Sequence, residues 1–168
     1  MKKGFTLIEV LIVLAIIFIL TSTTFPFYRT AQRQYIIENA AQKLAQDIRR
    51  VEEMAMAAKE RPGAPVNFQR GYGIRLQTNS SNYILFADLN NNRNYDPGEE
   101  IEISSLGENV RITNLSPDSP LTIVFLPPDP QAIITPSTSL ATITLSLLGS
   151  STFQRRVVVN AIGLIYVE

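Results

Sequence analysis

The pattern of hydrophobic and polar positions divides this chain into three parts. In the first, from Phe5 to Phe27, most residues are apolar and Glu9 is the only ionisable side chain. At about 1.5 Å per residue, a helix of this length can cross a hydrocarbon core of about 30 Å. We therefore expect residues 5–27 to form a transmembrane helix.

The second part, residues 28–60, predicts an amphipathic helix. Its start is polar, and apolar residues then recur every three or four positions, which is the spacing of one helical face: Ile37, Ala41, Leu44, Ile48, Val51, Ala55 and Ala58. The other face offers the i,i+4 ion pairs Lys43–Asp47 and Arg49–Glu53. An alanine-rich stripe of this length favours packing against a sheet over a coiled-coil seam.

Two proline-containing segments interrupt the helical pattern. Pro26 has no amide hydrogen, so the carbonyl of Ser22 loses its helical partner, and we expect a kink there. The segment 61–65, Arg-Pro-Gly-Ala-Pro, predicts the end of the helix.

In the third part, residues 61–168, the period of the pattern changes to two, which is typical of strands. The candidate strands are 72–76, 83–86, 100–103, 110–113, 121–126, 140–147, 153–159 and 164–167. The proline-rich segment 117–136 is interpreted as a long loop with one strand inside it. The whole pattern predicts an α+β fold, in which a long N-terminal helix packs on a mostly antiparallel β-sheet domain.

Composition excludes several kinds of site. The 168 residues include 15 Lys plus Arg and 15 Asp plus Glu, so no net charge points to nucleic acid. Cys and His are both absent, which excludes thiol nucleophiles, disulfides, His-based triads and the usual zinc sites. Adjacent acids such as Glu99 and Glu100 point different ways on a strand, and there is no glycine-rich phosphate loop. We therefore expect no enzymatic activity.

The first residues admit three interpretations. A secretory signal would be cut after the apolar run at an A-x-A-like site, which the sequence at 21–23, Thr-Ser-Thr, fits poorly. A plain signal anchor gives no reason for a carboxylate at Glu9. The third interpretation rests on a short basic leader that ends at Gly4 and is followed by Phe5-Thr6-Leu7-Ile8-Glu9. This string resembles the class III signal of type IV prepilins and type II secretion pseudopilins.

That resemblance implies a processing pathway and a set of partners. Prepilin peptidase would remove the leader, residues 1–4, by cutting after Gly4, and the amine of Phe5 would be methylated. Lys2 and Lys3 place the N-terminus in the cytoplasm, so the protein would be single-pass in the inner membrane with a periplasmic β-rich domain. Other pilins or pseudopilins would contact its N-terminal helix during assembly into a filament at an inner-membrane platform.

Glu9 needs a partner, because an acidic side chain at mid-bilayer costs about 2.5–3.5 kcal/mol on insertion scales. Cleavage would create a cationic amine at Phe5, four residues away on the same helical face, so self-neutralisation is one interpretation. The resemblance implies another, in which Glu9 pairs with the amine of the preceding subunit and sets the axial register of assembly. It also implies that the stretch around Pro26 becomes extended inside the filament.

The segment from Asp88 to Glu99 is a candidate calcium loop. Counted from Asp88, oxygen-bearing side chains occupy positions 1, 3, 5, 7, 9 and 12, as in an EF-hand: Asp88, Asn90, Asn92, Asn94, Asp96 and Glu99. The segment departs from that pattern at Arg93, where an EF-hand has glycine, and it lies between strands. The alternative is a solvated, Asn-rich hairpin loop.

This loop and the segment from Arg155 to Gly163, near the end of the sequence, resemble the corresponding parts of the GspH/FimT-type minor pilins and pseudopilins. The resemblance implies a structural subunit near the tip of a type II secretion pseudopilus for protein export. The alternative is a minor pilin of a type IV pilus, involved in pilus assembly and DNA uptake. Some FimT-like proteins bind DNA through arginines after a glycine turn, but here Leu164 and Ile165 follow Gly163. Because non-specific binding needs several phosphate contacts, nucleic acid is not an expected partner.

Overall fold

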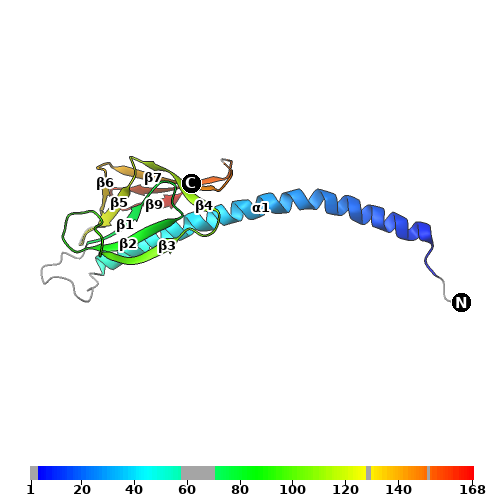
Figure 1. Ribbon diagram of the computed structural model, residues 1–168, viewed down its shortest axis with the longest axis horizontal. Helices are drawn as coiled ribbons and strands as arrows, with labels where there is room; N and C mark the ends of the chain where they lie inside the picture. Colours follow the sequence, from blue (N-terminus) through cyan, green and yellow to red (C-terminus); the bar gives the residue numbers. More distant parts are fainter. Residues whose placement is uncertain (1–3, 58–70, 128–129, 151) are drawn as a thin grey trace. The chain divides into compact units, whose positions relative to one another are not determined.

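The computed structural model describes residues 4–57, 71–127, 130–150 and 152–168, and of residues 23–27 it describes the backbone only. The chain divides into two units, 1–35 and 36–168. The elements, all but β8 labelled in Figure 1, are α1 (Leu7–Met56), β1 (Gly71–Leu76), β2 (Asn82–Asp88), β3 (Glu100–Ser105), β4 (Val110–Ser116), β5 (Leu121–Phe125), β6 (Ala132–Thr135), β7 (Leu140–Leu147), β8 (Gln154–Asn160) and β9 (Ile165–Val167).

Helix α1 contains both helical segments that the sequence predicts. It is assigned as one helix of 50 residues. The predicted kink at Pro26 falls among residues 23–27, and the predicted terminator at 61–65 falls among residues 58–70, so both lie outside what the structure fully describes. Among the described residues, no helix is both long and apolar enough to cross a membrane.

The strands form two sheets, where the sequence predicts one. The five-stranded sheet has the order β3-β2-β1-β5-β6, and the four-stranded sheet has the order β4-β7-β8-β9. Every strand pair is antiparallel. The pairing of strands that are distant in the sequence determines which sheet each strand joins. Alternation of hydrophobic and polar residues predicts that a strand exists but not its partner.

The interpretation of segment 117–136 as a long loop with one strand is wrong. It holds two strands, β5 and β6, which pair in the register Ile123↔Ile134 and Val124↔Ile133. Every residue of β5 is buried, and β5 lies between β1 and β6 in the sheet. The prolines did not prevent this, since Pro120 precedes β5 and Pro136 follows β6, where no ladder hydrogen bond needs their missing amide hydrogen.

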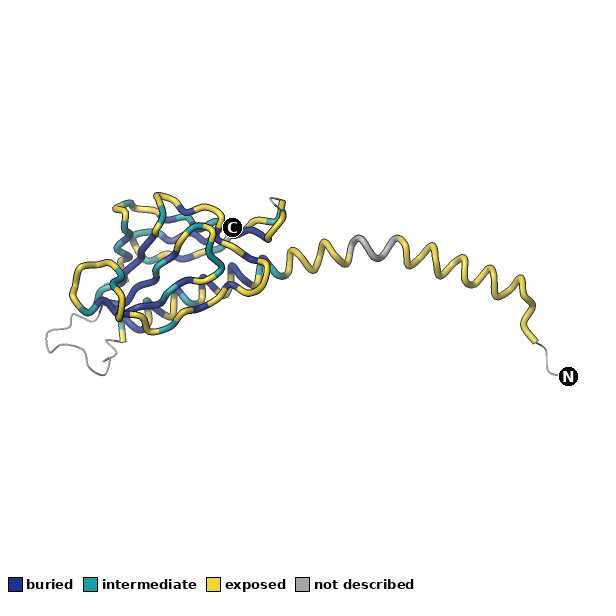
Figure 2. The backbone as a smooth tube through the Cα atoms, in the orientation of Figure 1, coloured by how far each residue is buried: buried dark blue, intermediate teal, exposed yellow. Residues whose placement is uncertain are grey.

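The core lies between the second half of α1 and the inner faces of the sheets (Figure 2). The predicted stripe from Ile37 to Ala55 is buried, which confirms that this face packs on sheet; Ala58 lies outside the described residues. Ala40, Ala45 and Met54 are also buried, so the buried face is wider than the stripe. Small alanine side chains let the helix approach the strands closely.

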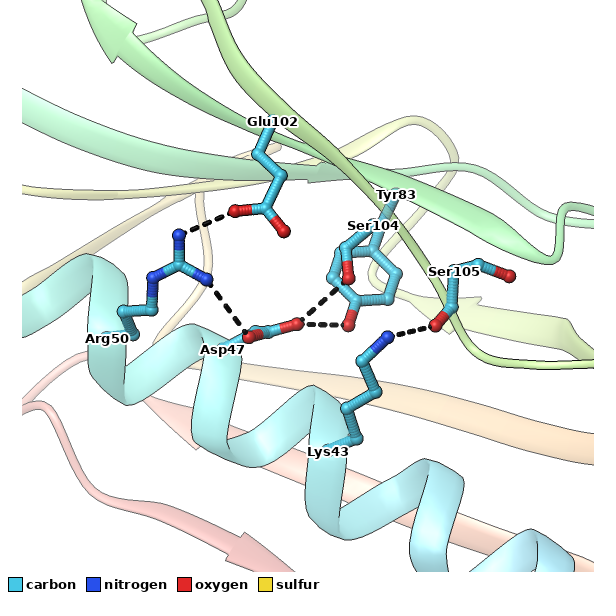
Figure 3. Close-up of polar contacts among 7 residues, drawn as sticks. All are labelled: Lys43, Asp47, Arg50, Tyr83, Glu102, Ser104 and Ser105. Atoms are coloured by element: carbon cyan, nitrogen blue, oxygen red, sulfur yellow. Dashed lines mark hydrogen bonds and ion pairs between the residues drawn. The ribbon is translucent and has the colours of Figure 1, made fainter.

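One flank of α1 bonds to the edge of the five-stranded sheet (Figure 3). Lys43 Nζ donates to the carbonyl of Ser105, so the predicted ion pair between Lys43 and Asp47 is wrong. Asp47 instead accepts hydrogen bonds from the hydroxyls of Tyr83 and Ser104, at 2.5 and 3.1 Å. Arg50 bridges Asp47 and Glu102: its Nη1 lies 3.8 Å from Asp47 Oδ1 and its Nη2 lies 2.5 Å from Glu102 Oε2.

The other flank of α1 bonds to the four-stranded sheet. Glu38 Oε2 pairs with Arg155 Nε on β8 at 2.6 Å. Arg49 Nη2 donates to the carbonyl of Ile165 on β9 at 2.9 Å, so the predicted pair with Glu53 is wrong as well. Both predictions failed for the same reason: the sheets reach the helix on both flanks and offer it partners that a helix alone lacks.

Candidate functional site

The first described residues form a helix N-terminus with a reciprocal cap. Thr6 Oγ1 accepts a hydrogen bond from the Glu9 amide at 3.4 Å, and Glu9 Oε2 accepts from the Thr6 amide and hydroxyl, each at 3.3 Å. The carbonyl of Thr6 also accepts from the amides of Glu9 and Val10. This is a capping box, which satisfies amide groups that the first helical turn otherwise leaves without partners.

The capping box assigns a role to Thr6 that the sequence analysis did not identify. The signal was present, because T-x-x-E before an apolar run is a signature of a helix start. The predicted processing residues Gly4 and Phe5 lie just before the box, and both are exposed. The structure therefore brings Gly4, Phe5 and Glu9 together at one helix end.

The apolar face of this helix has no protein partner within the described chain. Its large apolar side chains from Phe5 to Leu20 are exposed over fractions from 49% at Val10 to 85% at Phe5, and Figure 2 shows this part of the chain as exposed. A shallow groove along it is lined by Leu11, Leu14, Ala15, Ile17, Phe18 and Thr21. An apolar surface of this extent is a surface for membrane or for other helices.

The polar residues after this apolar run are satisfied within the helix. Thr21 Oγ1 donates to the carbonyl of Ile17 at 2.7 Å, and Ser22 Oγ donates to that of Ile19 at 2.9 Å. Hydroxyls that bond back to the preceding turn expose little unpaired polar surface. The helix is therefore compatible with an apolar environment up to Ser22.

In the candidate calcium loop, two buried carboxylates hold the backbone. Asp88 is fully buried and accepts from the amides of Asn92 and Arg93, at 3.1 and 2.8 Å. Glu99 is 4% exposed and accepts from the amides of Leu89 and Asp96, each at 2.9 Å. These bonds fold the loop back on itself.

The amide side chains of the loop also have partners. Asp96 Oδ2 accepts from the side-chain amides of Asn90 and Asn92, at 2.7 and 2.6 Å. The side-chain oxygens of Asn90 and Asn92 accept from backbone amides two residues ahead. Asn94 Oδ1, another candidate ligand, accepts from the buried hydroxyl of Thr122 at 3.2 Å and so ties the loop to β5.

The loop also covers apolar side chains on the outer face of the five-stranded sheet. The Tyr95 ring packs edge-on against buried Phe86 with their centroids 5.6 Å apart, and Arg75 lies 5.1 Å from the centroid of Tyr95. Beneath them Gly73 leaves room for the Phe86 ring, since a Cβ at Gly73 would lie 2.5 Å from Phe86 Cζ. These contacts give the loop a structural role as a cover for the sheet.

In the described part of the chain, no group of three or more Asp, Glu, His or Cys side chains is placed to hold a metal ion. The predicted calcium ligands Asp88, Asn90, Asn92, Asp96 and Glu99 do lie in one loop, and their oxygens already accept hydrogen bonds there. Calcium binding at this loop stays a prediction.

Three ionisable groups at the contacts between α1 and the sheets have shifted pKa values. Burial raises the pKa of the Tyr83 hydroxyl, and its hydrogen bond to Asp47 raises it further. The hydrogen bond from Arg155 lowers the pKa of the Glu38 carboxyl. The bond to Glu102 raises the pKa of Arg50. Each shift reports an interaction that joins two elements, so these ionisable groups stabilise the fold.

Comparisons with known families cover both ends of the chain. Residues 1–25 match the prokaryotic N-terminal methylation motif, and residues 40–163 match the family of type II transport protein GspH. Pilin-like protein PilA1 of Thermus thermophilus is 33% identical over 107 residues, which are 64% of this chain and 62% of PilA1. The chain therefore spans less than two thirds of that curated relative.

Solved structures share the fold. The type IV minor pilin FimU of Pseudomonas aeruginosa superposes with a TM-score of 0.52 at 13% identity, over 78% of this chain and 91% of FimU. A second crystal form gives 0.53 at 12% identity, over 79% and 87%. The likeness confirms the predicted α+β fold, a long N-terminal helix packed on antiparallel β-structure.

Proposed function

Because this chain belongs to the family of type II transport protein GspH and carries the N-terminal methylation motif, we propose that it is a minor pseudopilin located at the tip of a type II secretion pseudopilus. Family membership makes it a prepilin-type structural subunit, not an enzyme, and its motif implies processing by prepilin peptidase and assembly with other pilins. The secretion machine and the tip position are the proposal.

The family match to type II transport protein GspH favours the secretion machine. One observation supports membrane anchoring and assembly through the N-terminal helix, which the alternative machine would share: the first half of α1 exposes all its large apolar side chains outside residues 23–27. Leaving such a surface in water is unfavourable, because burial of each CH₂ group contributes about 0.8 kcal/mol of stabilisation. The surface can contact the hydrocarbon of the membrane before assembly and the N-terminal helices of neighbouring subunits after it. We propose that residues 5–27 cross the inner membrane once, with the N-terminus cytoplasmic and residues 61–168 periplasmic, before extraction into the filament.

Glu9 has a specific place in this proposal. Its Oε2 accepts both bonds from Thr6, and within the described residues its Oε1 has no hydrogen-bond partner. After cleavage behind Gly4, the capping box would remain, because Thr6 and Glu9 both follow the cut. Glu9 can then cap its own helix through one oxygen and pair through the other with the Phe5 amine of a neighbouring subunit. Such a pair, removed from water, would set the axial register.

Deletion of the gene tests the assignment to secretion. We expect folded exported enzymes to accumulate in the periplasm while surface pili keep their normal number. Complementation with the intact gene should restore export. Untouched secretion would overturn the proposal.

The alternative is a minor pilin of a type IV pilus, with a part in pilus assembly and DNA uptake. The name of the relative PilA1, a pilin-like protein 33% identical over the matched residues, favours it. Here the deletion would leave export intact and reduce the number of pili. The same strain therefore separates the two candidates.

A further inference from the structure

The helical segment that follows the apolar run has an unusual charge pattern. Between Glu9 and Glu38, the only charged side chains are Arg29 and Arg33. Both are exposed, and they lie between two exposed aromatic residues, Tyr28 at 69% and Tyr35 at 67%. The segment 28–35 is therefore cationic and aromatic, with no acid of its own.

Helical spacing gathers these side chains on one side of α1. Tyr28 and Tyr35 are seven residues apart, which places them two turns apart on one face. Arg29 and Arg33 are four apart on the adjoining face. At 3.6 residues per turn, the four side chains lie within about half of the helix circumference. The opposite side carries the small or neutral residues Thr30, Ala31 and Gln34.

The segment is long enough to cross a bilayer interface. Eight residues of helix rise about 12 Å, whereas the headgroup region on one side of a bilayer is roughly 5–8 Å thick. The segment starts directly after the apolar run at residue 27 and ends where the first unit ends, at Tyr35. It can thus cross the whole headgroup layer.

We propose that residues 28–35 are a phospholipid-binding collar, in which Arg29 and Arg33 bind headgroup phosphates on the periplasmic surface of the inner membrane. Tyr28 lies at the boundary between hydrocarbon and headgroups, and Tyr35, about 10 Å further along the helix axis, lies on the water side of the headgroup layer. This inference rests on the proposed membrane anchoring of residues 5–27. The collar adds a lipid class, anionic phospholipid, and a position along the helix axis to that anchoring.

The chemistry of both residue types fits this partner. A guanidinium presents a planar set of N–H donors that matches the oxygens of a phosphate, and it sheds water more readily than an ammonium group. A tyrosine ring has an apolar body and a hydroxyl that stays hydrated, which is why tyrosine is enriched at both membrane surfaces. An anionic lipid surface also attracts each nearby cation.

The chain has no Trp, so a single tryptophan reports its own depth in the bilayer. We would reconstitute the full chain, as Phe18→Trp, Tyr28→Trp or Tyr35→Trp, into phosphatidylcholine vesicles with bromine at a shallow or a deep acyl position. We expect deep bromines to quench Trp at 18 most and shallow bromines to quench Trp at 28 most, with weaker quenching of Trp at 35 than of Trp at 28. A Tyr95→Trp variant in the globular unit should not be quenched.

A change in the charge of the lipid tests whether Arg29 and Arg33 bind anionic headgroups. Replacing a third of the phosphatidylcholine by phosphatidylglycerol should increase shallow quenching of Trp at 28. When the substitutions Arg29→Gln and Arg33→Gln are added to the same tryptophan variant, they should abolish that increase. The matched pair Arg93→Gln and Arg111→Gln removes the same charge from exposed positions of the globular unit and should leave the increase intact.

The outcomes separate this inference from the proposed function. If Trp at 18 is not quenched, the membrane anchoring fails, and the collar fails with it. If Trp at 18 is quenched but Trp at 28 is not, the anchor stands and the collar is overturned. Quenching at 28 that phosphatidylglycerol does not increase, or an increase that survives loss of both arginines, would also overturn it and would point to a protein partner for segment 28–35.

Discussion

At the residue scale, Glu9 combines two roles that substitution can separate. Its carboxylate caps the helix through Thr6, and its charge is proposed to pair with a neighbouring Phe5 amine. A capping box accepts glutamine in place of glutamate, because an amide oxygen can also accept the backbone bond. Glu9→Gln therefore keeps the cap and removes the charge, whereas Thr6→Ala removes the cap and keeps the charge.

We expect Glu9→Gln to be cleaved and inserted normally but to enter filaments at least about tenfold less, since truncating one partner of a buried charge pair costs ~2–5 kcal/mol. Thr6→Ala should lose only ~0.5–2 kcal/mol of helix stability and enter filaments more normally. Immunoblots of sheared filaments against membranes give incorporation, and mass spectrometry of the N-terminus gives cleavage. Equal incorporation of Glu9→Gln and wild type would show that charge does not set the register.

If the Asp88–Glu99 loop binds calcium, titration of residues 29–168 with millimolar Ca²⁺ should give a heat of binding in calorimetry and a raised melting temperature. Asp96→Asn should weaken the response, because it removes a carboxylate that only the side chains of Asn90 and Asn92 contact in the loop. Asp118→Asn, an exposed acid in another loop, serves as the control. The absence of heat and of any melting shift would end the hypothesis and leave the loop as a cover for Phe86.

At the scale of elements, α1 is held between two sheets by polar contacts on both flanks. Asp47 with Tyr83 and Ser104 joins it to the five-stranded sheet. Arg155 with Glu38 joins it to the four-stranded one. Tyr83 is the most informative of these groups, because its hydroxyl is buried and its bond reaches a carboxylate.

Tyr83→Phe should lower the free energy of unfolding at pH 7 by about 1.5–3 kcal/mol, the value of a hydrogen bond to a charged group. The pKa of Tyr83 is raised in the folded protein. Its contribution is therefore complete below the unfolded value of about 10 and is lost as pH rises toward the folded pKa. Denaturant unfolding of residues 29–168 should show the gap between wild type and variant narrowing above about pH 10.

The control for this measurement is Tyr95→Phe, whose hydroxyl contacts Glu100 at 3.3 Å on the surface. It should change the free energy of unfolding by less than about 0.5 kcal/mol. A gap between wild type and Tyr83→Phe that stays constant from pH 7 to pH 11 would contradict the proposed role of the Tyr83–Asp47 bond.

At the scale of the whole molecule, charge balance argues against a nucleic-acid partner. Positive and negative side chains are equal in number, and both arginines of β8 face carboxylates. Arg155 pairs with Glu38 at 2.6 Å and Arg156 with Glu168 at 3.0 Å. Neither cation is left to join a basic patch, which a DNA-binding minor pilin would need.

We expect no retardation of double-stranded DNA by the protein, even at low salt. The variant Glu38→Gln with Glu168→Gln releases both arginines and should give weak retardation that disappears at moderate salt, which shows that the assay can detect such binding. Strong retardation by wild type, lost between low and moderate salt, would instead support DNA uptake as the function.

What the sequence by itself determined is local. The apolar run, the T-x-x-E start of α1, the buried stripe from Ile37 to Ala55 and most strand positions follow from residues within about four positions of each other. Backbone geometry repeats over 3.6 residues in a helix and over two in a strand, so short stretches of sequence carry these signals. The predicted processing and assembly residues Gly4, Phe5 and Glu9 belong to this local part.

Only the tertiary structure decided which strands share a sheet and which polar groups meet. Tyr83 and Asp47 are 36 residues apart, and Arg155 and Glu38 are 117 apart. The helix pairs predicted for Lys43 and Arg49 gave way to strand carbonyls for the same reason. A side chain takes whichever partner the packed chain brings nearest, and that choice depends on the pairing of distant strands, which no local period records.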